Sequence, residues 1–82
     1  MSPRLRQLSG RDVVRALGTF GFDVVATRGS HAKLRRVLPS GVREPLTIPL
    51  HDTLAVGTAR AIFRQASRYV SESELKPWFF TR

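Results

Sequence analysis

The fold is decided by residues 22–50, FDVVATRGSHAKLRRVLPSGVREPLTIPL. Apolar and polar residues alternate at the start of this stretch, which is the period of a β-strand that buries one face. Two turns that contain glycine, at residues 28–30 and 39–41, divide the stretch into three. The sequence therefore predicts three consecutive antiparallel strands, at residues 22–27, 31–38 and 43–50. The third strand contains Pro45 and Pro49 and is expected at an edge of the sheet, because proline donates no hydrogen bond to a neighbouring strand.

A helix is predicted on each side of these strands. Ser9 followed by Asp12 has the spacing of a capping box, and a helical apolar stripe follows it, which indicates a helix over about residues 10–19. A second helix is expected over about residues 58–68. Its apolar face is formed by Ala59, Ile62, Phe63 and Ala66, while Arg60, Arg64 and Arg68 step along the opposite side.

The C-terminal end has a weaker helical signal. Ser71 and Glu74 have capping-box spacing, but Pro77 limits a third helix to a turn or two. The tail at residues 76–82 contains Trp78-Phe79-Phe80 and is too apolar to be an idle end. Residues 1–7, in contrast, are expected to form a loose basic lead-in. The whole chain, residues 1–82, is then a single α+β domain of order α-β-β-β-α, with the helices packed on one face of a three-stranded antiparallel sheet and a short C-terminal helical turn.

The charge balance points to an acidic partner. The 82 residues include 14 Lys and Arg against six Asp and Glu, for a formal net charge of +8, and all but two of the cations are arginine. Such an excess is typical of proteins that bind nucleic acid or an acidic protein. The chain has no cysteine, so it has no disulfides and no thiolate metal site. It also has no apolar signal core and no stretch long enough to span a membrane, so we expect a cytoplasmic protein.

The two histidines of the chain are predicted to lie on one face of the sheet. If Val24, Leu34 and Ile48 face the helices, then residues of the other parity face away. These are His31, Lys33, Arg35, Thr47, Pro49 and His51. A three-residue loop at 40–42 would place His31 opposite His51, and a register two residues different would make them diagonal neighbours. Arg36 falls on the core side, where we expect it at the rim with its charged end extended towards solvent.

Several chemistries are open to such a pair of histidines. A metal site is disfavoured, because only Asp23 or Asp52 could supply a third ligand. A triad of Ser30, His31 and Asp52 is disfavoured as well, because neighbours on a strand point to opposite faces. Acid–base chemistry on RNA needs no metal, since the 2′-hydroxyl of the substrate is the nucleophile. The simplest alternative is that His31 is a turn residue on a solvated strand.

Three elements in order resemble the HicA toxin family of bacterial mRNA interferases, which are paired with HicB antitoxins. The resemblance covers about Leu8 to Leu75. It is carried by Ser9-Gly10-Arg11-Asp12-Val13-Val14-Arg15-Ala16-Leu17 with Gly21-Phe22, by Arg28-Gly29-Ser30-His31, and by Ile48-Pro49-Leu50-His51 with Gly57-Thr58-Ala59-Arg60-Ala61-Ile62 and Gln65-Ala66.

The resemblance implies a fold similar to double-stranded-RNA-binding domains and RNA cleavage with one catalytic histidine. That role falls to His31, because it stands in the matching Gly-Ser-His. His51 and Ser30 are candidates for assisting roles. The RNA-binding residues are expected to be Arg28, Lys33 and Arg35, with no cofactor, no metal and a HicB-like acidic antitoxin as partner. Two other functions stay open: a module that holds RNA on the same basic face without cutting it, and a protein that only binds its partner.

Overall fold

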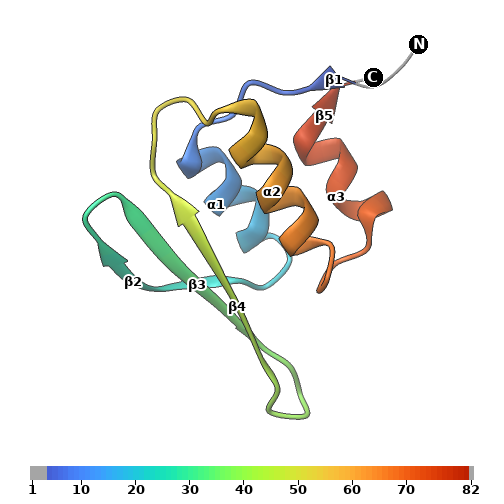
Figure 1. Ribbon diagram of the computed structural model, residues 1–82. Helices are drawn as coiled ribbons and strands as arrows, with labels where there is room; N and C mark the ends of the chain where they lie inside the picture. Colours follow the sequence, from blue (N-terminus) through green and yellow to red (C-terminus); the bar gives the residue numbers. More distant parts are fainter. Residues whose placement is uncertain (1–3, 82) are drawn as a thin grey trace.

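The computed structural model describes residues 4–81 and has the predicted α+β architecture (Figure 1). Strands β2, β3 and β4 form an antiparallel sheet in that order, and the helices cover one face of it. A second, two-stranded sheet joins the chain ends, and β4 is an edge strand, as its prolines predict. In chain order the elements are β1 (Arg4–Leu5), α1 (Gly10–Gly18), β2 (Asp23–Arg28), β3 (His31–Val37), β4 (Arg43–Pro49), α2 (Val56–Ala66), α3 (Glu72–Phe79) and β5 (Phe80–Thr81).

Helix α1 begins with the predicted capping box. The Ser9 side chain accepts a hydrogen bond from the Asp12 amide at 3.0 Å, and the Asp12 carboxylate accepts one from the Ser9 amide at 2.9 Å. Two amides at the helix start are thereby satisfied. The hydrogen bond from the Ser9 backbone, and then that from its side chain, lower the pKa of the Asp12 carboxyl. Ser71 is the N-cap residue of α3, but the capping box predicted for it and Glu74 does not form, because the Ser71 side chain makes no cap hydrogen bond.

The register of β3 and β4 differs by two residues from the pairing expected with a three-residue loop. Val37 lies opposite Arg43 and His31 opposite Pro49. The connection is a five-residue turn, closed by a 2.9 Å hydrogen bond from the Leu38 amide to the Val42 carbonyl. The strand β4 therefore ends before His51, and the directly opposed pair of histidines does not form. This hairpin projects well beyond the helices (Figure 1).

Strand β2 departs further from the alternation predicted for it. All six of its residues are exposed, and its pairing with β3 shifts between Val24 and Ala26. The shift is a β-bulge, in which one extra residue reverses the parity of everything beyond it. Because Ala26 has the parity of Val24, strict alternation predicts that it faces the helices, but it lies opposite the outward-facing Lys33. The following turn has two residues, not three, because Arg28 pairs with His31 and Gly29 takes φ 54°.

The core lies between the sheet and the helices. Phe22, directly before β2, is buried in this core, to which β3 and β4 contribute Ala32, Leu34, Leu46 and Ile48. The predicted apolar face of α2 is confirmed, since Ala59, Ile62 and Ala66 are buried and Phe63 packs against the core. The arginines on the opposite side of α2 are exposed.

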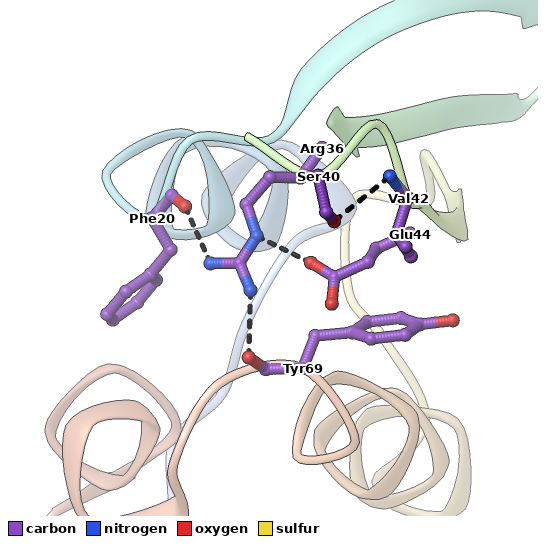
Figure 2. Close-up of polar contacts among 6 residues, drawn as sticks. All are labelled: Phe20, Arg36, Ser40, Val42, Glu44 and Tyr69. Carbon is purple, nitrogen blue, oxygen red and sulfur yellow. Dashed lines mark hydrogen bonds and ion pairs between the residues drawn. The ribbon is translucent and has the colours of Figure 1, made fainter. Parts of the chain in front are cut away.

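Contrary to the prediction, the charged end of Arg36 does not extend into solvent. Its guanidinium makes a 2.7 Å ion pair with Glu44 and donates hydrogen bonds to the carbonyls of Phe20 and Tyr69, at 3.0 and 2.8 Å (Figure 2). It also lies 5.0 Å from the centre of the Phe22 ring. Arg36 thus ties β4, the end of α1 and the segment after α2 to the middle strand.

The two chain ends are built into the fold. Arg4 and Leu5 pair with Thr81 and Phe80, so the described part of the lead-in is not loose. Phe79 is fully buried and packs edge-on against Phe63, which confirms that the apolar tail is not idle. Residues 1–3 and 82 of the predicted lead-in and tail lie outside the described part of the chain.

Candidate functional site

The sheet face that points away from the helices carries the predicted site residues. Along β3, His31, Lys33 and Arg35 are exposed, while Ala32 and Leu34 between them are buried. Thr47 on β4 is likewise exposed between buried neighbours. The predicted parity of these two strands is confirmed. We call the sheet surface that carries His31, Lys33, Arg35 and Thr47, with the residues paired beside them, the outer face.

A shallow depression of about 520 Å³ lies on the outer face around His31. Ala26, Arg28, His31, Lys33 and Thr47 line it. Two cross-strand rows build it, because Arg28 and Pro49 flank His31, and Ala26 and Thr47 flank Lys33. The depression brings together three of the six predicted site residues: one histidine and two cations.

The bulge in β2 is what places Arg28 in this depression. Asp23 lies opposite Arg35 and shares the outward parity. With strict alternation from Asp23, Arg28 would face the helices. The extra residue near Val25 restores the outward direction, so that Arg28 lies directly across from His31. No feature of the β2 sequence predicts this bulge.

The positive charge of the outer face is not neutralised within the described chain. Across residues 4–81 the ion pairs are Arg15–Asp12 and Arg36–Glu44, and neither involves a residue of the outer face. The exposed cations on this face are Arg28, Lys33, Arg35 and Arg43, with Asp23 as the single acid in the same register. This arrangement favours the binding of phosphate or carboxylate groups.

Arg35 and Arg43 extend the basic surface along the sheet. Both line a smaller depression of about 240 Å³, together with Val25, Lys33 and Pro45. Arg43 was not among the predicted site residues. The signal that could have found it is the register of β3 and β4, which gives Arg43 the same outward parity as Lys33 and Arg35.

The two residues proposed for assisting roles lie outside the depression. His51 is exposed in the segment that follows β4, and its backbone carbonyl accepts a hydrogen bond from the Gly10 amide at 2.9 Å. Ser30 is exposed in the turn, and its backbone carbonyl accepts from the Leu50 amide. The fold thus uses the main chain of both residues to join α1 and the end of β4 to the hairpin beside His31.

The described residues offer no group of three His, Cys, Asp or Glu side chains that could together hold a metal ion. What the outer face does offer is an exposed imidazole between cations. An imidazole can take up and release a proton near neutral pH, and the cations can stabilise negative charge that develops on a bound phosphate.

The sequence matches a family model over residues 10–67, from the first residue of α1 to just beyond α2; the model describes the HicA toxin of bacterial toxin–antitoxin systems. The chain belongs to the HicA toxin family. It is thus the toxin of a toxin–antitoxin pair, which implies an antitoxin partner. Both histidines lie inside the matched region of this HicA toxin, and β1, α3 and β5 lie outside it.

No curated protein matches this HicA-family chain. In the part of the chain that the structure describes, the helices are too short and too polar for one to cross a membrane.

Proposed function

We propose that this HicA toxin is a metal-independent endoribonuclease of the cytoplasm that cleaves mRNA with His31 as its catalytic histidine. The observation that carries the proposal is the outer-face depression. It combines an exposed imidazole with Arg28 and Lys33, and neither cation has a carboxylate partner within residues 4–81. Family membership supports the toxin role, and arrest of translation by mRNA cleavage is one way in which such a domain becomes toxic.

The chemistry uses the nucleophile that RNA itself carries. The 2′-hydroxyl attacks the adjacent phosphorus, the bond to the 5′-oxygen breaks, and the products end in a 2′,3′-cyclic phosphate and a 5′-hydroxyl. His31 takes the proton from the 2′-hydroxyl or returns one to the 5′-oxygen. Lys33 and Arg28 stabilise the negative charge that builds on the phosphate oxygens, and Arg35 holds a neighbouring phosphate.

A second function is supported by the same charge pattern. A basic sheet face can hold RNA without cutting it, and His31 would then only donate a hydrogen bond. Four exposed cations on one face favour binding regardless of chemistry. The two functions differ in whether purified protein shortens RNA.

The test is cleavage of a defined RNA and of the same RNA with a single 2′-deoxynucleotide at the cut site. Cleavage should persist in EDTA, and the deoxy substitution should block it while leaving binding intact, because it removes the nucleophile. DNA should stay uncut. Cutting of the 2′-deoxy substrate, or activity that EDTA abolishes, would refute the mechanism, and binding without any cleavage would favour the second function.

We propose further that a HicB-like acidic antitoxin inhibits the toxin by covering the outer face. Its carboxylates would compete with RNA phosphates for Lys33 and Arg35, and opposite charge would speed association. Amide hydrogen exchange with and without the antitoxin should show protection across residues 28–36 and 46–52. Protection confined to residues 76–82 would instead identify the C-terminal tail as the docking site and refute direct occlusion.

A further inference from the structure

A second hollow lies on the helical side of the molecule, at the two chain ends. It has a volume of about 470 Å³ and is lined by the segment before α1, by α1 and by the C-terminal segment. Its side chains include Arg6, Arg15 and Trp78, and we call it the terminal groove. Residue 6 and residue 78 lie outside the region that matches the HicA family, so the groove is built in part by chain that the family match does not cover.

Trp78 gives the groove an exposed aromatic surface. It is 42% exposed, although Phe79 next to it is fully buried. Phe20 packs edge-on against the indole at 6.5 Å between ring centres, which supports one side of it. A supported, half-exposed indole is the kind of platform on which a nucleic-acid base stacks.

The charges in the groove are arranged for phosphate. Arg6 is exposed and uses its Nε to donate a 3.4 Å hydrogen bond to the Phe80 carbonyl, which orients the guanidinium. Arg15 is 76% exposed. Asp12 also lines the groove, and its carboxylate accepts the Ser9 amide and lies 3.5 Å from Arg15. The pair offsets part of the charge of Arg15, but an exposed pair of this kind is weak, so a phosphate can compete for the guanidinium.

Arginines lie on both sides of the free edge of β2, between the terminal groove and the depression around His31. Arg15 also lines a hollow of about 370 Å³ between α1 and β2, together with Arg11 and Thr27. Thr27 lies opposite the buried Ala32 and so points to the helices, whereas the next residue of β2, Arg28, points to the outer face and lines the depression around His31. The series Arg28, Arg11, Arg15, Arg6 thus lies along the route that a bound strand would take from the outer face, around the free edge of β2, to Trp78.

We propose that the terminal groove is a second RNA subsite, in which a base of single-stranded substrate stacks on Trp78 while its phosphates follow this series of arginines. The inference rests on the proposed function, because it extends the RNA that is cut at His31. Stacking is tolerant of base identity, so the subsite contributes affinity for any unstructured strand long enough to reach it.

The test uses Trp78 as its own reporter, because it is the only tryptophan of the chain. Single-stranded oligouridylate of roughly 16 nucleotides, at the upper end of known single-strand site sizes, is titrated into the His31→Ala variant. Indole fluorescence should be quenched saturably. A uridine dinucleotide, which cannot span from the depression to the groove, should leave the fluorescence unchanged at the same nucleotide concentration.

Substitutions then separate stacking from general charge, with affinity measured by anisotropy of the labelled oligouridylate. Trp78→Ala should weaken binding by about tenfold, and Trp78→Phe should restore much of it. Arg15→Ala should weaken binding by about two- to fivefold. Arg64→Ala removes an exposed arginine of α2 that does not line the groove, and it should have less effect than Arg15→Ala.

The outcomes distinguish this proposal from the proposed function. Unquenched fluorescence, equal affinity of Trp78→Ala and the parent, or equal effects of Arg15→Ala and Arg64→Ala would overturn the RNA subsite even if wild-type protein cleaves RNA. A groove that responds only to an acidic protein partner overturns it too. Conversely, quenching with the predicted variant pattern supports the subsite even if the wild type leaves RNA uncut.

Discussion

Arg35 and Arg36 are neighbours on β3, but their side chains lie on opposite faces of the sheet and have different roles. Arg36 points to the helices, where its side chain is 21% exposed and its guanidinium is held by Glu44 and two main-chain carbonyls. Arg35 points to the outer face and takes part in no ion pair formed within residues 4–81. The same side chain is a structural tie on one face of the sheet and an available cation on the other.

The difference shows how a small, highly charged domain divides its arginines. A partly buried charge must be paired and hydrogen-bonded within the protein, so its donors are not available to a ligand. An exposed charge contributes little to stability and stays free for a ligand. The contrast between the two faces separates stability from RNA binding, and each can be tested by itself.

The largest stability effect is expected at Arg36. Arg36→Ala should lower the free energy of unfolding by about 2–4 kcal/mol, because it removes hydrogen bonds to charged and main-chain acceptors and leaves Glu44 unpaired in a mostly buried site. Arg35→Ala should change it by less than about 0.5 kcal/mol. Urea denaturation followed by circular dichroism measures both. Equal destabilisation by the two substitutions would contradict the division between the faces.

A smaller effect is expected on RNA affinity, and there the substitution at Arg35 matters directly, because Arg35 is on the RNA-binding face. Arg35→Ala, in the well-folded protein, should weaken RNA binding by about two- to fivefold. It should also make the log–log dependence on salt shallower by about 0.7, the contribution of one single-strand phosphate. Affinity measured across a range of salt concentrations in the His31→Ala background checks this. Affinity that does not change with salt would contradict a basic RNA-binding face.

Parity alone predicts the outer face of β3 and β4, because one face of each strand carries large apolar side chains and the other carries cations. Parity fails in β2, where no residue is buried and nothing in the sequence fixes the register. The bulge there is set by pairing with β3, and it decides that Arg28 joins His31. For His51, parity left two registers open, and the five-residue turn from Leu38 to Val42 selects the one that differs by two residues from direct opposition of His31 and His51.

The predictions for Arg36 and for the N-terminal lead-in failed for a different reason. The partners of Arg36 at Phe20 and Tyr69 are main-chain carbonyls far apart in the sequence, and no local pattern reveals such acceptors. The pairing of Arg4 and Leu5 with Thr81 and Phe80 joins the two ends of the chain and depends on the packing of α3. Long-range contacts of this kind follow from the assembled core.

The central claim is tested most directly by a comparison of the two histidines. Both are exposed, so neither His31→Ala nor His51→Ala should alter the fold, as circular dichroism and thermal unfolding will show. His31→Ala should reduce the rate of RNA cleavage in single-turnover assays by at least about 100-fold, the lower end of the usual contribution of acid–base catalysis. His51→Ala, outside the depression, should retain most of the activity. Undiminished cleavage by a well-folded His31→Ala variant would contradict the assignment of the catalytic site.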